Sequence, residues 1–277
     1  MLFSCHEENE RVVNDVEIEI KEEERIDELH RKGYRIIQNQ KKFCFGMDAV
    51  LLSDFTRVKT GEKVLDLGTG TGVLPRNMYS YGADWTGTDI SKEQIAKAVE
   101  LSKAFGMDIT YQVGATEDLD FPEETFDVIT ACQCFWYFDH EKVMPMLSKW
   151  LKPNGKLVLL YMAWLPFEDD IAGSSEEIVL KYSPKWSGAG ETRHPIWIPE
   201  CADACFTLEE HEEYDVKVPF TRESWHGRMK ACRGVGASLS GEELAKWEEE
   251  HWNMLQQKAP EHFEILHTAA LAVLQKK

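Results

Sequence analysis

Two short stretches of the sequence contain side chains whose types and spacing could bind a nucleoside-like cofactor. The first, Val64 to Leu74, is an apolar run with one acid, Asp66, that leads into glycines at every second position, Gly68 to Gly72. Such glycines let the backbone turn sharply and approach a ligand closely, which a Cβ would obstruct. The second stretch ends in Asp89, roughly 20 residues further on, where an acid can accept hydrogen bonds from both ribose hydroxyls.

The glycine turn does not by itself decide which cofactor binds. A dinucleotide fingerprint needs its third glycine one place later, where the chain has Val73, so a pyrophosphate cradle is disfavoured. Asp66 inside the strand indicates instead a cofactor with an amino-acid end, whose ammonium group needs nearby carbonyls and a carboxylate. Asp89 could alternatively cap the following helix, but Ser91 fills that role better.

A parallel sheet is expected to hold these residues, because short β-branched runs alternate with amphipathic stretches after Gly61. The expected strands are Lys63–Leu67, Asp84–Asp89, Ile109–Val113, Phe126–Ala131, Lys156–Ala163, Tyr214–Phe220 and Phe263–Leu274. Helices are expected from Thr71, from Ser91 with Gln94 in a capping box, from Glu141 to Trp150, from Thr221 to Arg233, and from Ser240 with Glu243 in a capping box to Lys258.

The pattern divides the chain into an N-terminal arm and cap, residues 1–45, and one domain, residues 46–277. A helix is predicted from Asp48 through Phe55. Residues 164–205 interrupt the rhythm, being rich in Pro, Gly, Ser and Trp with little periodicity. Insertions of that kind in compact domains are usually lids or binding loops, so we predict a lid there.

The composition favours a globular protein that binds a small molecule or another protein. With 277 residues, 43% of them hydrophobic, the chain can bury a full core. Its net charge of -18 repels phosphate backbones and anionic lipids, which disfavours nucleic acid as a partner. The apolar stretches are too short to span a membrane and the N-terminal residues are acidic, so we expect a cytoplasmic protein.

The cysteines and histidines give no strong signal of a metal site or a catalytic base. Seven cysteines without an export signal indicate free thiols, and the Cys132-x-Cys134 and Cys201-x-x-x-Cys205 spacings are not those of zinc sites. We therefore expect no metal. Single histidines such as His140 and His194 are interpreted as surface or hydrogen-bonded residues.

The sequence V-L-D-L-G-T-G-T-G, followed by G-T-D-I-S, resembles the first two motifs of class I S-adenosylmethionine (SAM) dependent methyltransferases. The resemblance continues through Gly114 to Phe121 and through L-K-P-N-G-K at Leu151 to Lys156. It implies SAM as the cofactor, with Asp66, Gly68 and Gly70 at its methionine end, Asp89 and Ile90 at the ribose and adenine, and Ala115, Thr116 and Glu117 at the adenine edge. The expected cofactor contacts also include Thr69, Gly72, Cys132 and Gln133.

Two narrower resemblances indicate different acceptors. Residues Arg35 to Pro75, beginning R-I-I-Q-N-Q-K-K-F-C-F-G, resemble bacterial tRNA adenine-N6 methyltransferases, and a basic cluster (Arg31, Lys32, Arg35, Lys41, Lys42) also favours RNA. Those enzymes carry an Asn/Asp-Pro-Pro-aromatic motif after the fourth strand, which grips the target amine. Here the stretch A-C-Q-C-F-W-Y-F-D has no proline and is similar instead to small-molecule methyltransferases of the ubiquinone-biosynthesis-like group.

We therefore expect a SAM-dependent methyltransferase that transfers a methyl group to a small molecule by in-line displacement. The expected fold is a Rossmann-like α/β sheet of seven strands, mostly parallel, with helices on both faces and an antiparallel last strand. Trp136, Tyr137 and His140 follow the fourth strand, where ligands bind in open α/β sheets, and are the expected acceptor-pocket residues. The catalytic group stays open, and an RNA methyltransferase or a SAM-binding protein without turnover remain alternatives.

Overall fold

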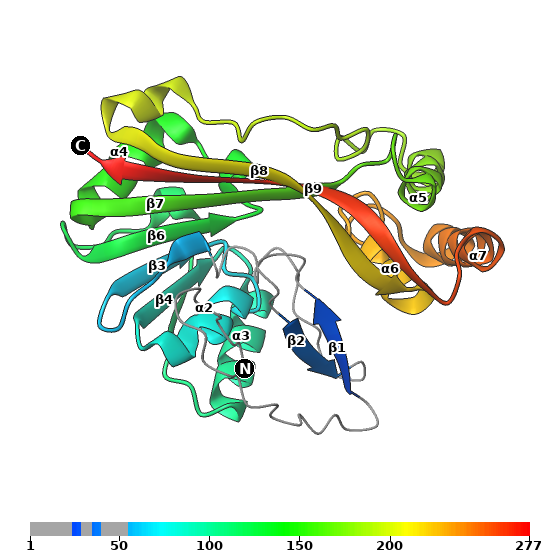
Figure 1. The fold of residues 1–277 in the computed structure, drawn as a ribbon, viewed down its shortest axis with the longest axis horizontal. Helices are drawn as coiled ribbons and strands as arrows, with labels where there is room; N and C mark the ends of the chain where they lie inside the picture. Colours follow the sequence, from blue (N-terminus) through cyan, green and yellow to red (C-terminus); the bar gives the residue numbers. More distant parts are fainter. Residues whose placement is uncertain (1–23, 29–34, 40–54) are drawn as a thin grey trace, which may run out of the picture.

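The computed structural model describes residues 24–28, 35–39 and 55–277 (Figure 1). The strands of its main sheet are β3 (Lys63–Leu67), β4 (Asp84–Asp89), β5 (Thr110–Val113), β6 (Phe126–Cys132), β7 (Leu151–Trp164), β8 (Phe206–Thr221) and β9 (His262–Lys276). The α-helices are α2 (Val73–Met78), α3 (Lys92–Ala104), α4 (His140–Trp150), α5 (Asp170–Tyr182), α6 (Arg222–Lys230) and α7 (Gly241–Lys258). The short 3-10 helices are η1 (Tyr79–Tyr81), η2 (Thr116–Asp118), η3 (Phe135–Tyr137) and η4 (Glu200–Ala204).

The main sheet has the strand order β5-β4-β3-β6-β7-β9-β8 among the described residues. Neighbouring strands from β5 to β7 pair in parallel, whereas β9 is antiparallel to both β7 and β8. Because β9 is the last strand along the chain, the predicted α/β architecture is confirmed. A separate hairpin pairs β1 (Glu24–Glu28) with β2 (Arg35–Asn39). The rest of the expected N-terminal arm and most of the helix predicted from Asp48 lie outside the described residues.

Helices cover both faces of the sheet, as its apolar strands require. Leu74 and Met78 of α2 pack with Val64 on one face, while Leu147 of α4 packs with Leu65 on the other. Neighbouring residues of a strand point to opposite faces, and Val64 and Leu65 are both 0% exposed. Burying each such side chain stabilises the fold by roughly 1.5–3 kcal/mol, so the continuous apolar run specifies a strand covered on both sides.

A third apolar cluster lies beside the sheet, where α5, α6 and α7 pack around Trp225 and Trp247. Figure 1 shows these helices at one end of the long ribbon formed by β8 and β9. The two strands pair from Phe206 to Thr221, but β7 pairs with β9 only up to Trp164 opposite His267. The ribbon therefore extends beyond β7, and the three helices are attached to its extension.

The segment Trp164 to Cys205 is more regular than the sequence predicts, because it contains α5. Asp169 begins this helix by accepting hydrogen bonds from the backbone N–H groups of Ile171 and Ala172, at 3.1 and 3.0 Å. The buried residues Ala172 and Val179 then pack into the third cluster. The expectation of an irregular segment is thus wrong for the helix and fits only the stretch that follows it.

Neither predicted capping box forms. The Ser91 hydroxyl accepts the backbone N–H of Gln94 at 3.2 Å, but the Ser91 N–H donates to the Asp89 carboxylate instead of the Gln94 side chain. Ser240 makes no side-chain cap bond, so the pairing expected with Glu243 is also absent there. The bond from Ser91 matters for the site, because Asp89, an expected cofactor contact, also holds the start of α3.

Candidate functional site

The glycine turn after β3 is shaped by backbone conformation and by close neighbours. Gly68, Gly70 and Gly72 have φ angles of 59°, 56° and 74°, in the left-handed region that favours glycine. A Cβ on Gly68 would lie 2.8 Å from Cys134, and one on Gly72 would overlap the Tyr111 hydroxyl. A Cβ on Gly70 would meet no atom within 4 Å. The turn thus packs tightly at both ends and leaves its centre open to a ligand.

Asp66 lies under this turn as a buried acid. Its side chain is 2% exposed, and its Oδ1 accepts a hydrogen bond from the Thr130 hydroxyl at 2.6 Å. Burial raises the pKa of Asp66 to about 6, and hydrogen bonds from hydroxyl groups only partly offset that effect. Among the described residues no cationic side chain forms an ion pair with it. A ligand ammonium would supply the missing positive charge.

Asp89 joins the glycine turn to the start of α3. Its Oδ2 accepts the backbone N–H of Gly70 at 2.9 Å, and its Oδ1 accepts the N–H of Ser91 at 2.8 Å. A carboxylate has about four acceptor sites, so two ribose hydroxyls can still donate to it. Ile90, the next residue, is 73% exposed, which leaves an apolar surface beside the carboxylate.

The η2 residues lie beyond the end of β5. Thr116 is 5% exposed, and Ala115 precedes the short helix as its N-cap. Glu117 is already engaged, because its Oε1 accepts the backbone N–H of Asp139 at 2.8 Å. The turn before α4 is therefore fastened to η2, and a Glu117 contact to adenine would have to share this carboxylate.

Gln133 has its side-chain amide occupied by the neighbouring strand. Its Oε1 accepts the N–H of Met162 at 3.2 Å, and its Nε2 donates to the Met162 carbonyl. With a φ of 60°, Gln133 sits at a sharp bend directly after Cys132, the last residue of β6. Contacts from Gln133 to a cofactor would therefore come from its backbone.

Together these groups fit SAM, the cofactor that the resemblance implies. A buried carboxylate matches an ammonium, an open glycine turn matches a carboxylate end, and Asp89 with exposed Ile90 matches a ribose and a flat base. All three lie at the carboxyl ends of β3 and β4, where parallel sheets bind ligands.

Beside these residues opens a cleft of about 950 Å³ that Gln133, Trp136 and Tyr137 help to line. The Trp136 ring meets Tyr161 of β7 edge to face, with centroids 4.8 Å apart. The Tyr137 ring lies 4.1 Å from the guanidinium carbon of Arg233. Two of the three expected acceptor-pocket residues thus line the cleft, together with Gln133, which is an expected cofactor contact.

His140 is not among the residues that line this cleft. Its Nε2 lies 2.9 Å from the carbonyl oxygen of Phe135, and its ring packs edge to face on Trp197, 4.8 Å between centroids. These contacts hold η3 against the loop that follows α5, so His140 supports the cleft wall.

A polar cluster in the cleft has no counterpart in the sequence-based prediction. His194 lies with Nε2 3.0 Å from Glu191 Oε1, Nδ1 2.7 Å from the Pro195 carbonyl oxygen, and its ring 5.1 Å from that of Tyr161. Tyr161 also hydrogen-bonds to Glu191. The pKa of the Tyr161 hydroxyl is raised, mainly by burial and to a smaller extent by this hydrogen bond. Both ring nitrogens of His194 thus lie within hydrogen-bond distance of an oxygen atom, which fixes the orientation of the ring in the cleft.

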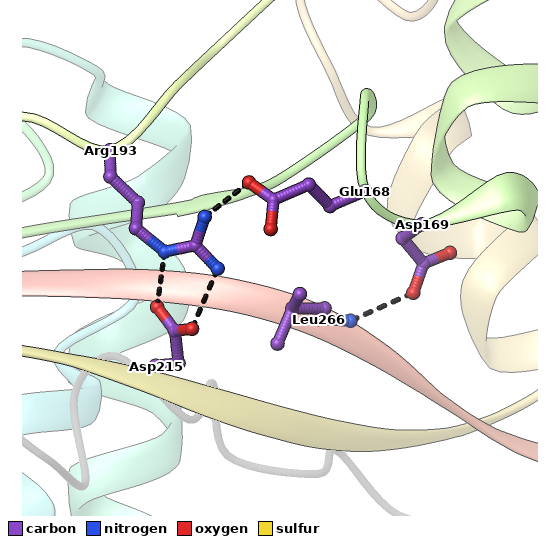
Figure 2. A network of polar contacts seen from close by, with 5 residues as sticks. All are labelled: Glu168, Asp169, Arg193, Asp215 and Leu266. Carbon is purple, nitrogen blue, oxygen red and sulfur yellow. Dashed lines mark hydrogen bonds and ion pairs between the residues drawn. The ribbon is translucent and has the colours of Figure 1, made fainter.

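The loop that contributes Glu191 and His194 is fastened by Arg193 (Figure 2). Its Nε and Nη2 donate to Asp215 of β8 at 2.7 and 2.6 Å, and its Nη1 pairs with Glu168. The guanidinium holds the pKa of Asp215 below its usual value. Asp169, beside Glu168, accepts the backbone N–H of Leu266 at 2.9 Å. The expected lid is therefore bound to the β8–β9 ribbon at two points.

Comparison with known proteins places this arrangement in a family context. Residues 65–159 match the family model of a methyltransferase domain. The matched region includes Asp66, the glycine turn, Asp89 and Gln133. It ends inside β7, so Tyr161, the loop after α5 and the helices α5 to α7 lie outside the match.

Similar proteins extend over the same half of the chain. The uncharacterized methyltransferase YcgJ of Bacillus subtilis is 28% identical over 131 residues, covering 47% of this chain and 52% of that protein. A ubiquinone biosynthesis O-methyltransferase of Xanthomonas euvesicatoria is 30% identical over 127 residues, covering 45% and 53%. The chain thus spans about half the length of these curated relatives.

The fold likeness reaches further than the sequence likeness. The crystal structure of YcgJ from Bacillus subtilis superposes with a TM-score of 0.53 at 20% identity, covering 82% of this chain and 97% of that chain.

Among the described residues, no helix has the length and apolar character of a membrane span, and no group of three or more His, Cys, Asp or Glu side chains is arranged to hold a metal.

Proposed function

We propose that the protein transfers the methyl group of SAM to a small molecule bound in the aromatic cleft. One observation carries this proposal. Gly68 of the open glycine turn packs closely against Cys134, and the two neighbours of Cys134, Gln133 and Phe135, line the cleft of about 950 Å³. The methyltransferase-domain match over residues 65–159 supports the donor half of the reaction.

SAM, when bound, supplies an activated methyl group on a sulfonium, so the chain's main task is to hold the acceptor atom in line with it. The rings of Trp136 and Tyr161, which stand nearly perpendicular to each other, offer apolar walls for the acceptor and exclude water from it. Their faces also favour a nearby positive charge such as a sulfonium. Positioning of this kind can account for several kcal/mol of the barrier, roughly 7–11 kcal/mol in well-oriented model reactions.

Glu191 is the group we assign to proton removal when the acceptor atom carries a hydrogen. The proton that an acceptor oxygen or nitrogen must lose on methylation would pass to the Glu191 carboxylate, which faces the cleft. His194 and Tyr161 hold that carboxylate in the cleft by hydrogen bonds. General-base assistance contributes typically about 100- to 10,000-fold.

Calorimetry followed by a labelling screen tests the proposal. We expect SAM and S-adenosylhomocysteine to bind with one site per chain, and NAD and ATP far more weakly. Methyl-labelled SAM incubated with fractionated metabolite extracts should then yield a labelled small molecule. Tight binding of NAD without SAM binding would contradict the donor assignment. Binding of SAM without label in any fraction would favour the alternative of a SAM-binding protein without turnover.

An RNA methyltransferase is the second candidate, favoured by the Arg35 to Pro75 resemblance and the basic residues near it. The net charge of -18 and the proline-free stretch after β6 oppose it. Bulk tRNA incubated with labelled SAM distinguishes the two, because we expect no label in tRNA at physiological salt. Incorporation into tRNA adenine would reverse our choice.

A further inference from the structure

The cleft carries a charge balance opposite to that of the whole chain. The sequence has 31 Lys and Arg residues against 49 Asp and Glu. The residues that line the cleft include three basic side chains, Lys185, Arg228 and Arg233, and one acidic side chain, Glu191. Glu191 is already engaged with His194, with 3.0 Å between oxygen and nitrogen. The cleft is therefore a positive site on a strongly negative protein, which attracts anions.

The two arginines are held by aromatic rings instead of carboxylates. The guanidinium carbon of Arg228 lies 5.1 Å from the Trp164 ring centroid, and that of Arg233 lies 4.1 Å from the Tyr137 ring centroid. Neither arginine forms an ion pair with any residue in the described part of the chain, although surplus carboxylates are abundant. A guanidinium placed over a ring keeps N–H groups available at its edge, where a carboxylate or phosphate can accept two of them.

The remaining walls of the cleft suit a flat apolar body. Trp136, Tyr161, Trp186 and Trp197 line it, and its volume of about 950 Å³ is within the range of small-molecule sites. Aromatic rings recognise planar molecules by stacking and by edge-to-face contact. An acceptor that packed against these aromatic walls and bound both arginines would combine a flat ring system with a negative group.

We propose that the methyl acceptor is a flat, apolar molecule with one anionic group, which Arg228 and Arg233 bind. Its ring system lies against Trp136 and Tyr161, and its nucleophilic atom reaches the edge of the cleft at Gln133, beside the cofactor residues. This assignment rests on the proposed methyl transfer, since it names the substrate class of the same site. In this assignment the two arginines select the acceptor by its charge, and methyl transfer takes place at the other end of the molecule.

A pair of fluorescent probes tests the anionic group directly, without knowledge of the natural acceptor. Anilinonaphthalene sulfonate and phenylnaphthylamine share their aromatic frame, but only the first carries a charge. We expect the full chain, saturated with S-adenosylhomocysteine, to bind one sulfonate probe per chain. The double variant Arg228→Gln/Arg233→Gln should bind it at least about tenfold more weakly, because each lost charge-assisted hydrogen bond is worth about tenfold or more. The neutral probe should not distinguish the two proteins.

Controls separate a lost anion site from lost charge or lost folding. The variant Lys103→Gln/Lys217→Gln also removes two exposed positive charges but none from the cleft, and it should bind the sulfonate probe like the native chain. Arg233→Lys keeps the charge and should show a smaller loss. Thermal melting and calorimetry with SAM check that each variant is folded. Unchanged sulfonate binding in the double arginine variant would overturn the proposal, as would equal losses for the two probes.

Displacement of the bound probe identifies the anion. Naphthoate and naphthyl phosphate should both displace the sulfonate probe from the native chain at lower concentration than neutral naphthamide, and the better of the two names the preferred group. Equal displacement by naphthamide would contradict an anionic acceptor. SAM calorimetry is independent of these outcomes, so a chain that fails to bind SAM overturns the methyl-transfer proposal, whereas one that binds SAM but shows no charge preference overturns only the substrate class.

Discussion

The residues proposed to hold the methyl donor and those proposed to hold the acceptor are assembled in different ways. The donor residues, Asp66 to Asp89, follow one another through β3, α2 and β4, and much of what they offer is backbone shape. The acceptor residues come from η3, β7, the loop after α5 and the end of α6, from Trp136 to Arg233, and act through side chains. A donor site built locally can be recognised in a sequence, whereas an acceptor site built at a distance becomes visible only after folding.

Truncation of Trp136 should give the largest separation between the two sites. Trp136→Ala removes the ring that meets Tyr161, while the glycine turn is unchanged. With an acceptor from the labelling screen, we expect kcat/KM to fall about 100-fold with near-native SAM affinity, because misplacing an acceptor by ~1 Å can cost that much. Trp136→Phe, which keeps a ring, should lose less. Loss of SAM binding in Trp136→Ala would show that the division between the sites is wrong.

Asp89→Ala should have the opposite effect and weaken SAM binding first. The loss of hydrogen bonds to a charged acceptor costs about 1.5–3 kcal/mol, or roughly 10- to 150-fold in affinity. The loosened Gly70 turn adds to this loss, because Gly70 donates to the same carboxylate. Asp84→Ala, at the other end of β4 and exposed, is the matched control and should bind SAM normally in the same calorimetric titration. Equal affinities for the two variants would remove Asp89 from the donor site.

Acid pH should weaken SAM binding through Asp66. In the free protein burial raises the pKa of Asp66 to about 6, so the carboxylate that attracts the ligand's ammonium is present above that pH and is lost as the pH falls through it. The expected loss of affinity approaches about tenfold per pH unit below 6, until the lower pKa of the complex is reached. Asp66→Asn should bind SAM weakly with a much flatter pH profile. An unchanged profile in that variant would assign the titration to another group.

Loosening the lid should have the smallest effect. Arg193→Met breaks the contacts to Asp215 and Glu168, which lie on the surface and contribute little to stability. We expect a several-fold fall in kcat/KM through a more mobile loop, with unchanged SAM affinity and little change in melting temperature. Arg57→Met, which breaks another exposed pair with a β8 acid, Glu210, is the matched control and should not change turnover. If both variants lower turnover alike, the lid contact has no special role.

The sequence was sufficient for the strands and the turn of the proposed donor half, because each of these features depends on near neighbours. The predicted bounds of β3 and β4 agree with the structure, and the alternation of glycines marks the turn from β3 into α2. Ser91 caps α3 as predicted, but the second bond of the capping box is wrong, because the Ser91 N–H donates to Asp89, two residues before it, instead of to the Gln94 side chain. Sequence patterns specify which groups can bond but not which of two nearby acceptors is closer.

The acceptor half could not be predicted from the sequence in the same way. Glu191 and His194 lie in a loop without periodicity, and their partner Tyr161 looks like any residue of a buried strand. Arg228 and Arg233 flank the end of a helix, where basic residues are ordinary. Only the folding of β7 against the loop and α6 brings these groups into one cleft.

The extension of the β8–β9 ribbon beyond β7 has a consequence for how this protein could be altered. The ribbon from His262 to Leu266 pairs with β8 but with no residue of β7, and α5, α6 and α7 pack into a core of their own beside it. The three helices therefore pack on the extension of the ribbon and meet the main sheet mainly at Trp164, the last residue of β7. Changes in the length or packing of these helices would therefore move Arg228 and Arg233 within the proposed acceptor cleft, while the strands that carry Asp66 and Asp89 keep their own core.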